Sequence, residues 1–592
     1  MDLDKLLSGV EKPARYIGGE YNSIMKEDAS LRWALCFPDV YEIGMSHLGS
    51  RILYHILNDL QEVACERAFA PWPDMGKALR EAKLPLFTLE TKRPLAQCDI
   101  IGFSLLYEMC YTNILTMLDL AGLPLRAKDR AEGMPLVVAG GPCVCNPMPV
   151  APFFDALLLG DGEELIVEVS LALLDARRRG LGRQAQLREI AAIPGVYVPE
   201  LRDESGAPAV RRIVKDLDAV PFTGRPVVPY LGIVHDRVAL EVMRGCTRGC
   251  RFCQAGYIYR PLRERDCDGL LAMAKAQLAC TGYDEVSLLS LSTGDYSQVH
   301  KLLPTIMKEM EQQRVSVSLP SLRVDAKLKE DLRVMQSVRK AGLTFAPEAG
   351  TQRLRDVINK NVSEEDVLTA AADAFAAGWS TVKLYFMIGL PTETDEDVLG
   401  IASLARKVAA LFYAKPKDAR GKGLRLTVSV STFVPKPFTA FQWCAQDPPE
   451  EIRRKQTLLR DAFKGARGVQ LNCHFSSLSV LEAAFSRGDE RLADVLEAAF
   501  SLGCRFDSWN EHFKAALWEQ AFEKHGLSAA GYAGRVYALD EPLPWDGLDM
   551  LVTKRYLQEE YLRAMAGETT PDCRTRCNGC FGKNHADDCC LS

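Results

Sequence analysis

The stretch MRGCTRGCRFCQ, residues 243–254, brings three cysteines together directly after the short apolar run VALEV at 238–242. The apolar run has the composition of a buried strand. Three thiolates on one short loop can hold three irons of a cubane iron–sulfur cluster. No fourth cysteine follows in register, so one iron keeps an open position, as a catalytic zinc ion does. The stretch therefore predicts a catalytic cluster on Cys246, Cys250 and Cys253.

Short apolar runs alternate with helical stretches from this loop to about Trp443. The strand-like runs are VALEVMRG, EVSLLSLS, SVSLPSL, LTFAPEA, TVKLYFMIG and RLTVSVSTFVP. Strands that alternate with helices imply a parallel sheet. Six such units fit a partial (β/α)6 barrel that is open on one side, and we assign this barrel to residues 231–449.

The ends of these strands resemble the radical S-adenosylmethionine (SAM) superfamily. The C-x3-C-x2-C spacing after the first barrel strand is its hallmark, and LSTGDYS, SLPSLRVD, FAPEAG and GLPTET end the next four strands. The resemblance implies a 4Fe–4S cluster on the three cysteines, SAM bound at the open iron, and reductive cleavage of SAM to a 5′-deoxyadenosyl radical. An electron donor such as a flavodoxin or ferredoxin is then expected. The implied SAM contacts are Gly294, Asp295, Ser321, Arg323, Glu348, Gly389 and Leu390.

Residues 29–175, after a polar segment at 1–28, show the same alternation and predict a Rossmann-like α/β domain. Strands are expected at 31–37, 98–106 and 135–141, helices at 48–60 and 112–122, and a strand followed by a helix within 155–174. Ligands of such sheets bind beyond the carboxyl ends of the strands.

The strand ends of this domain resemble a cobalamin-binding domain. DVYEIG at 39–44 matches an Asp-x-His-x-x-Gly loop, SLL at 104–106 matches Ser-x-Leu, and a Gly-Gly pair follows at 140–141. Tyr41 replaces the histidine, and a neutral phenol is a poor ligand for cobalt, so we expect any cobalamin to bind without a protein histidine. His47 is expected to cap or pack at a helix start. The implied cobalamin contacts are Asp39, Tyr41, Gly44, Ser104, Gly140 and Gly141.

Two alternatives for this domain stay open. It can be a Rossmann-like domain that binds no cobalamin. It can also carry a second cluster, as the methylthiotransferases do in a comparable domain, because four cysteines lie near successive strand ends. These are Cys36, Cys110, Cys143 and Cys145.

The remaining segments are a connector at 176–230, expected to contain a β-hairpin, a mainly helical extension at 450–570 and a cysteine-rich tail at 571–592. The tail repeats the C-x3-C-x2-C spacing, but no strand precedes it. Five cysteines and a histidine within eighteen residues suit a closed four-ligand zinc site or an auxiliary cluster. The tentative ligands are Cys573, Cys577, Cys580 and Cys589.

The composition is that of an ordinary globular protein, with 592 residues, 47% of them hydrophobic, and a net charge of −6. The net charge gives no sign of the basic face that long nucleic acids require. No run of about 18 apolar residues suggests a membrane span, and the N-terminus has no signal-peptide pattern. We expect a cytoplasmic protein whose 19 cysteines are reduced and, where clustered, bind metal.

The sequence therefore predicts a radical SAM enzyme that transfers a methyl group to unactivated carbon through cobalamin. One alternative is sulfur insertion into RNA or protein, as in the methylthiotransferases. Another is a protein without enzymatic activity that uses its clusters in iron–sulfur binding, assembly or electron transfer. No spacing in the chain identifies the substrate, which can be a small molecule, an RNA or a protein.

Overall fold

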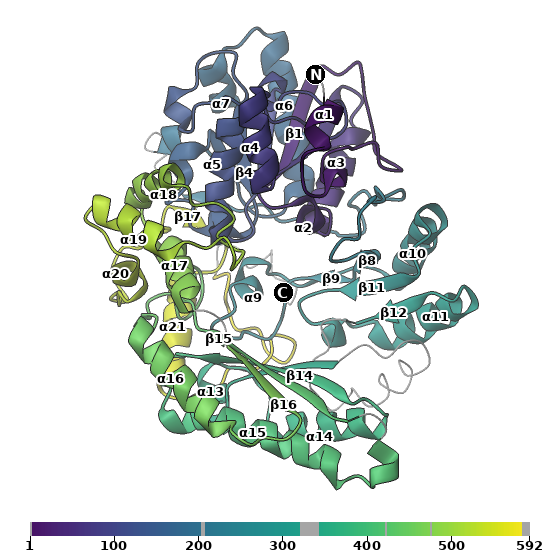
Figure 1. Ribbon diagram of the computed structural model, residues 1–592, viewed down its shortest axis with the longest axis vertical. Coiled ribbons are helices and arrows are strands. Elements are labelled where there is room, and N and C mark those ends of the chain that lie inside the picture. The colour runs from purple at the N-terminus through teal and green to yellow at the C-terminus, as the bar shows by residue number, and fades with distance from the viewer. Residues whose placement is uncertain (1–2, 203–207, 320–342, 421–422, 474–475, 583–592) are drawn as a thin grey trace.

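The computed structural model describes residues 3–202, 208–319, 343–420, 423–473 and 476–582. Its N-terminal domain lies above the barrel in Figure 1, and the C-terminal helices run along one side of both. The fold is α/β, as the alternating pattern predicts.

The N-terminal domain is built on one sheet with strand order β2-β1-β3-β4-β5-β6, parallel except for β6. Trp33 and Leu35 face a core shared with α3, α6 and α7, while Ala34 and Cys36 face a core shared with α4 and α5. Helices on both faces make the domain Rossmann-like. Its strands are β1 (Leu31–Phe37), β2 (Val63–Phe69), β3 (Ile100–Ser104), β4 (Leu136–Gly140), β5 (Ala156–Leu158) and β6 (Val196–Tyr197); its helices are α1 (Leu3–Leu7), α2 (Tyr41–Gly44), α3 (Leu48–Asp59), α4 (Pro73–Ala82), α5 (Tyr111–Leu120), α6 (Gly162–Arg178) and α7 (Arg183–Ala191).

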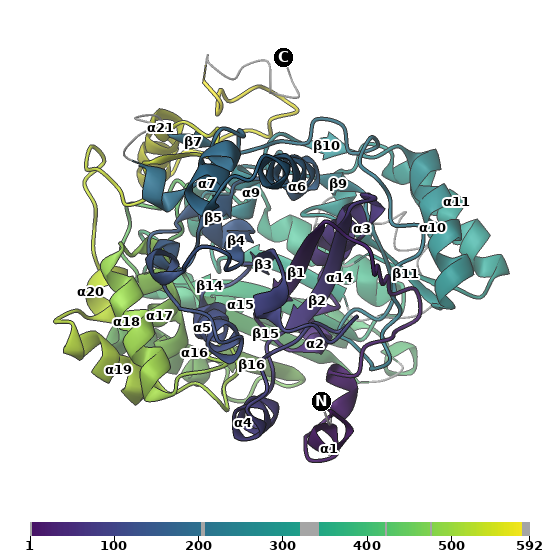
Figure 2. The same ribbon diagram turned by 90° about the horizontal axis from the view of Figure 1, so that it is seen from above.

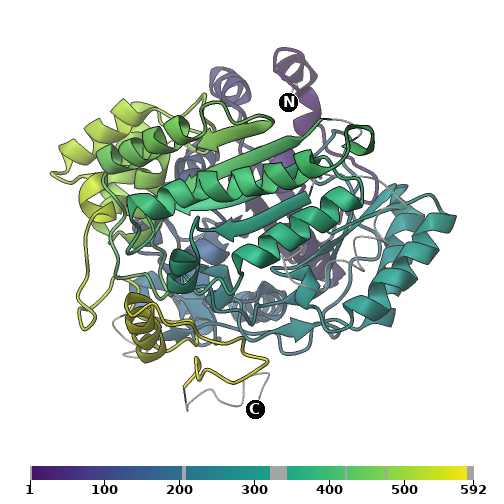
Figure 3. The same cartoon turned by 90° about the horizontal axis from the view of Figure 1, so that it is seen from below.

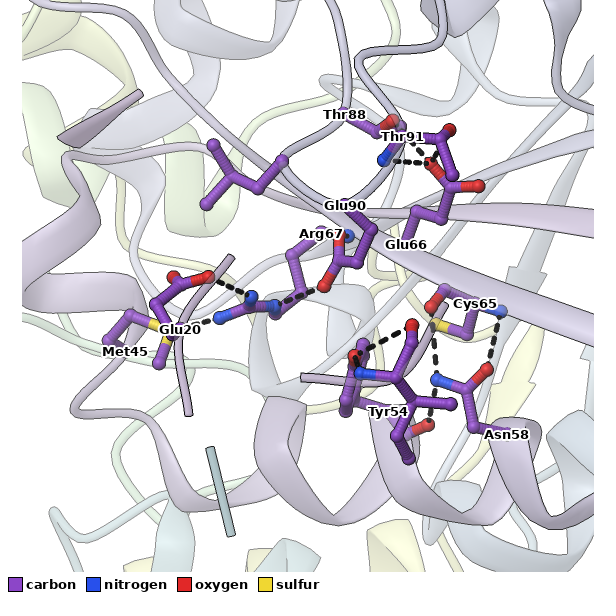
Figure 4. Close-up of polar contacts among 12 residues, drawn as sticks. Glu20, Met45, Tyr54, Asn58, Cys65, Glu66, Arg67, Thr88, Glu90 and Thr91 are labelled. Atoms are coloured by element: carbon purple, nitrogen blue, oxygen red, sulfur yellow. Dashed lines mark hydrogen bonds and ion pairs between the residues drawn. The ribbon is translucent and has the colours of Figure 1, made fainter. Parts of the chain in front are cut away.

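Edge strand β2 was not expected from the sequence, because it carries Glu66 and Arg67 in a fully buried position. Figure 4 shows how these charges are satisfied. The Arg67 guanidinium lies 2.8 Å from Glu20 and 2.7 Å from Glu90, and Thr91 donates to Glu66 at 2.6 Å. Buried charges persist when they are paired and hydrogen-bonded, so this strand is buried despite its polar residues.

The expected hairpin in the connector does not form. β6 pairs antiparallel with β5, whereas β7 (Ala209–Val210) pairs in parallel with β17 (Leu548–Asp549) of the C-terminal extension. The Arg211 side chain adds a bond to the carbonyl of Met550 at 2.8 Å. Two-residue strands gain little from each other, so tertiary contacts decide their partners.

The barrel consists of two parallel sheets with strand orders β12-β11-β8 and β13-β14-β15-β16. All six expected strands are present, and β16 adds a strand in a region expected to be mainly helical. Figure 3 shows helices α14 to α16 (green) on the outer face of the second sheet. The strands are β8 (Val238–Glu241), β11 (Glu285–Leu289), β12 (Ser316–Ser318), β13 (Leu343–Glu348), β14 (Thr381–Ile388), β15 (Arg425–Thr432) and β16 (Val469–Cys473); the helices are α9 (Ala255–Ile258), α10 (Cys267–Thr281), α11 (Val299–Gln312), α13 (Gln352–Val357), α14 (Glu364–Ala376), α15 (Asp395–Ala414) and α16 (Pro449–Ala462).

The C-terminal extension packs mainly on the N-terminal domain. Helix α18 lies against α5, and both contribute to one hydrophobic core. The chain then returns to the barrel, and the last described residues extend beyond α21 in Figure 2. None of the described helices is both long and apolar enough to span a bilayer. The helices are α17 (Ser476–Arg487), α18 (Arg491–Leu502), α19 (Ala515–Lys524), α20 (Ala529–Ala533) and α21 (Lys554–Met565).

Candidate metal centre

The cluster loop, residues 245–254, begins at the end of β9 (Met243–Arg244), which pairs with β10 (Arg263–Glu264). Gly245 has a φ of 92°, and a Cβ at this position would lie 2.5 Å from the carbonyl oxygen of Pro261. Only glycine allows both the turn and this close approach. Gly245 therefore allows the chain to turn from β9 into the cluster loop.

Arg251 fixes the middle of the loop. Its fully buried guanidinium lies 3.1 Å from Glu560 of α21 and donates to the carbonyl of Val357 at 2.9 Å. The amide of Asn359 donates to the carbonyl of Gly249 at 3.1 Å. Contacts from α13 and α21 thus hold the loop backbone in one arrangement, which a metal centre needs.

The three thiols of the loop interact with one another. Burial raises the pKa of Cys253 to about 12, and the nearby Cys250 and Cys246 sulfurs add to the rise. The raised pKa favours the protonated thiol. Coordination reverses this preference, because a metal removes the thiol proton. Among the described residues, no three Cys, His, Asp or Glu side chains are arranged to hold a single ion. Cysteines on a cubane bind separate irons, and the C-x3-C-x2-C spacing of this loop suits such a cluster.

Asp295 connects the end of β11 to the cluster loop. The Arg248 side chain donates to its carboxylate at 2.9 Å, and Ser292 donates at 2.6 Å. Gly294 lies in the same short turn, Thr293–Asp295. Gly294 and Asp295, the two SAM residues expected at the end of β11, therefore lie beside the cluster loop. The Asp295 carboxylate already accepts hydrogen bonds from protein groups.

Glu348, at the end of β13, has a φ of 69° and lies 3.2 Å from the ammonium group of Lys360. The same ammonium group lies 6.0 Å from the ring centre of Phe252, next to Cys253. Glu348 thus reaches the loop through Lys360. Sequence reasoning missed Lys360, since nothing in its local spacing marks it.

The end of β14 also meets the loop, because Leu390 belongs to the same apolar cluster as Phe252. The Gly389 amide donates to Glu393 at 2.7 Å, and Lys455 lies 2.8 Å from that carboxylate. These contacts fix the backbone where the sequence predicts contact with SAM. The two remaining predicted contacts, Ser321 and Arg323, lie outside the described residues.

A cavity of about 430 Å³ lies between the N-terminal domain and the barrel. His47 lines it and caps α3 as expected, since its Nδ1 accepts the Ser50 amide at 3.1 Å. Burial lowers the pKa of His47 to about 4, so this imidazole is neutral. The lining includes Ser104, Gly140 and Gly141 at the strand ends and Glu241, Arg244 and Gly245 at the base of the cluster loop.

The other three expected cobalamin residues are not in the lining of this cavity. The Asp39 carboxylate accepts a bond from the Trp509 indole at 3.0 Å, and the Tyr41 hydroxyl donates to Glu20 at 3.0 Å. A Cβ on Gly44 would lie 2.3 Å from the Phe69 ring. In the structure, these three residues attach the loop after β1 to neighbouring parts of the protein.

The four cysteines near the N-terminal strand ends are buried. Burial raises the pKa of the thiols of Cys36, Cys110 and Cys143 well above its usual value, and that of Cys145 to about 12. Buried thiols in apolar surroundings behave as small hydrophobic side chains.

The tail reaches the cluster loop. The amide of Cys573 donates to the carbonyl of Thr247 at 3.0 Å, and the carbonyl of Cys580 accepts the Thr553 amide at 2.9 Å. The structure thus brings three of the four tentative tail ligands beside the first cysteine of the loop. Cys589 lies outside the described residues.

This fold and this loop define a class of protein. A Rossmann-like domain precedes a partial barrel, and three barrel strand ends meet a three-cysteine loop after the first strand. The description "Radical SAM proteins, N-terminal" matches residues 49–199, and "Radical SAM superfamily" matches residues 240–405. The chain belongs to the radical SAM superfamily.

Individual relatives are more distant. Uncharacterized protein MJ0966 of Methanocaldococcus jannaschii is 29% identical over 468 residues, covering 78% of this chain and 90% of the relative. A tRNA-2-methylthio-N(6)-dimethylallyladenosine synthase of Sorangium cellulosum is 26% identical over 265 residues, 39% of this chain and 53% of that protein.

Two solved structures are also similar. The radical SAM methyltransferase TsrM of Kitasatospora setae, solved with cobalamin and a 4Fe–4S cluster, has a TM-score of 0.46 and 15% identity, covering 68% of this chain and 72% of that one. The cobalamin-dependent SAM radical enzyme OxsB has a TM-score of 0.46 and 14% identity, covering 67% of this chain and 53% of that one.

Proposed function

We propose that this protein reductively cleaves SAM at a 4Fe–4S cluster held by Cys246, Cys250 and Cys253. The observation that carries the proposal is that three strand ends converge on the loop that bears these cysteines: Asp295 after β11 bonds to Arg248, Glu348 at the end of β13 is linked through Lys360 to Phe252, and Leu390 after β14 shares an apolar cluster with Phe252. When bound, the cluster supplies the electron that divides SAM into methionine and a 5′-deoxyadenosyl radical.

The chain's own residues position the cluster loop and exclude water from it. Arg251 and Asn359 hold the loop, and the backbone at Gly389 is fixed by Glu393. Phe252 covers the site together with Leu390 in an apolar cluster. Such surroundings exclude water from a reactive intermediate.

The loop cysteines provide the first test. Cys246→Ala, Cys250→Ala and Cys253→Ala should each abolish release of 5′-deoxyadenosine from SAM under reducing, anaerobic conditions, because each removes one iron ligand. Cys280→Ala is the matched control, since that thiol is equally half-buried but donates to the carbonyl of Gly224 at 3.2 Å. SAM cleavage by a loop variant at the wild-type rate would refute the assignment.

We infer further that the 430 Å³ cavity binds cobalamin and that the reaction is methyl transfer. The supporting observation is that the cavity extends from Ser104, Gly140 and Gly141 to Gly245 of the cluster loop. A cofactor in this cavity would lie next to the first cluster. The neutral His47 ring uses its Nδ1 lone pair to cap α3, so its Nε2 carries the proton and serves as a donor rather than a cobalt ligand.

Binding of hydroxocobalamin, followed by absorbance, tests this inference. Gly140→Leu should weaken binding at least tenfold, since the new side chain starts at the cavity wall, 3.4 Å from the Leu158 carbonyl. Gly232→Leu is the control, because a Cβ there meets nothing within 4 Å. Absence of corrinoid binding by the wild-type protein, or equal affinities for wild type and Gly140→Leu, would reject the inference.

The methylthiotransferase alternative has less support. It requires a second cluster in the N-terminal domain, whereas none of the candidate ligands there, Cys36, Cys110, Cys143 and Cys145, lines the cavity beside the cluster loop. The modified substrate separates the alternatives, because methylthio transfer adds sulfur and methyl transfer does not, a difference that mass spectrometry detects. Both reactions take a methyl group from SAM and release S-adenosylhomocysteine together with 5′-deoxyadenosine. An electron-transfer or assembly protein would release neither.

A further inference from the structure

A small cavity beside the cluster loop is lined by four cysteines. Cys573, Cys577 and Cys580 come from the tail, and Cys246 comes from the loop. Asp572 strengthens the junction, because its carboxylate accepts a bond from the Thr247 hydroxyl at 2.9 Å. Three tail thiols therefore lie next to a ligand of the first cluster, although more than three hundred residues separate them in sequence.

Arg260 lines the same cavity and is only 3% exposed. Its Nε donates to the carbonyl of Gly256 at 3.0 Å, but neither Nη atom has a hydrogen-bond partner. Cys573, Cys577 and Cys580 line the same cavity as this buried cation.

The protein offers this cation aromatic faces instead of an anion. The guanidinium carbon lies 4.8 Å from the ring centre of Tyr257 and 5.8 Å from that of Tyr556. Among the described residues, no carboxylate forms an ion pair with Arg260. A buried charge without a counter-ion is costly, and aromatic rings recover only part of that cost. A negatively charged group in the cavity would complete the site.

We propose that Cys573, Cys577 and Cys580 hold a second iron–sulfur cluster, with Arg260 as its buried counter-cation. Metal-bound cysteines are deprotonated, so thiolates on a cluster supply negative charge in the cavity that Arg260 lines. Binding of this cluster does not depend on SAM cleavage, whereas its role in electron delivery rests on the proposed function. One electron from a donor of the flavodoxin or ferredoxin class would reduce this cluster, which is reoxidised as it passes that electron to the first cluster.

Iron and sulfide analysis after anaerobic reconstitution tests the proposal. A variant with Cys246, Cys250 and Cys253 all changed to Ser should keep about half of the wild-type iron and sulfide. Further replacement of Cys573, Cys577 and Cys580 by Ser should remove the rest. The control changes Cys280, Cys444 and Cys473 to Ser, three cysteines elsewhere that are half-buried like the loop cysteines, and should lose no iron.

The outcomes separate this proposal from the proposed function. A loop-cysteine variant that holds no iron and sulfide, or that holds zinc alone, would overturn the tail cluster. A tail-cysteine variant, in which only Cys573, Cys577 and Cys580 are changed to Ser, measures the iron of the loop cluster independently, so either site can fail without the other. Circular dichroism spectra that match the wild type establish that each variant is folded.

The charge of Arg260 has its own readout. In the loop-cysteine variant, Arg260→Met should lower the reduction potential of the remaining cluster, because a nearby cation favours the added electron. Arg260→Lys should restore most of the potential. Equal potentials for the Arg, Met and Lys forms would contradict the role of counter-cation.

Discussion

At the scale of single residues, the loop and its neighbours are governed by buried charges. Arg251 is paired with Glu560, and both side chains are fully buried. Arg260, nine positions along the chain, has aromatic neighbours but no carboxylate partner within the part of the chain that the structure describes. Removing one partner of a buried pair is costly, because the other charge stays uncompensated. These residues are therefore placed to couple the stability of α21 to the shape of the cluster loop.

The Arg251–Glu560 pair gives a direct prediction. Glu560→Ala should lower the free energy of unfolding by about 3–5 kcal/mol and reduce iron retention, since Arg251 would lose its counter-ion. Urea titration followed by circular dichroism measures the first effect.

The control for this variant lies on the same helix. Glu559 pairs with Arg555, whose side chain is 87% exposed, and exposed pairs contribute only about 0–1 kcal/mol. Glu559→Ala should therefore change stability little. Equal losses in both variants would contradict the structural role assigned to Glu560.

The sequence identifies the residues of local motifs but not their distant partners. Cys246, Cys250 and Cys253 form a recognisable spacing on one loop. Arg260 and Glu560 show no local pattern, because their significance comes from contacts with elements hundreds of residues away or with other loops. Lys360 is similar, since only the fold brings it between Glu348 and Phe252.

At the scale of elements, continuous apolar runs were the reliable signal. The six expected barrel strands are present, and β1 has the expected bounds, 31–37. β2 escaped prediction because ion pairs to Glu20 and Glu90 bury an arginine in it. β16 has the sequence VQLNC, is half-buried, and lies between two helices along the chain. Its weak strand pattern therefore did not stand out within a region expected to be mainly helical.

The hairpin expectation failed for a different reason. β6 and β7 are each two residues long, and a Gly/Ser turn between them suggested that they pair. Short strands carry too few bonds to choose a partner locally. β7 instead joins the C-terminal extension to the connector through β17, a choice that depends on the completed fold.

At the scale of the whole molecule, the extension and tail bind the two α/β units together. The extension shares a core with the N-terminal domain, and the tail bonds to the cluster loop of the barrel. The sequence predicts each unit from its own periodicity. It does not predict that the tail cysteines lie beside the loop cysteines, because no local signal records a contact between segments this far apart.

A cluster on Cys246, Cys250 and Cys253 that cleaves SAM should release 5′-deoxyadenosine. Reconstituted wild-type protein, incubated anaerobically with SAM and a low-potential reductant, should form 5′-deoxyadenosine and methionine in equal amounts, and Cys250→Ala should form neither. The tail-cysteine variant should still cleave SAM when the reductant is a small molecule that reaches the loop directly. Wild-type protein that carries its iron and sulfide yet leaves SAM intact would contradict the account.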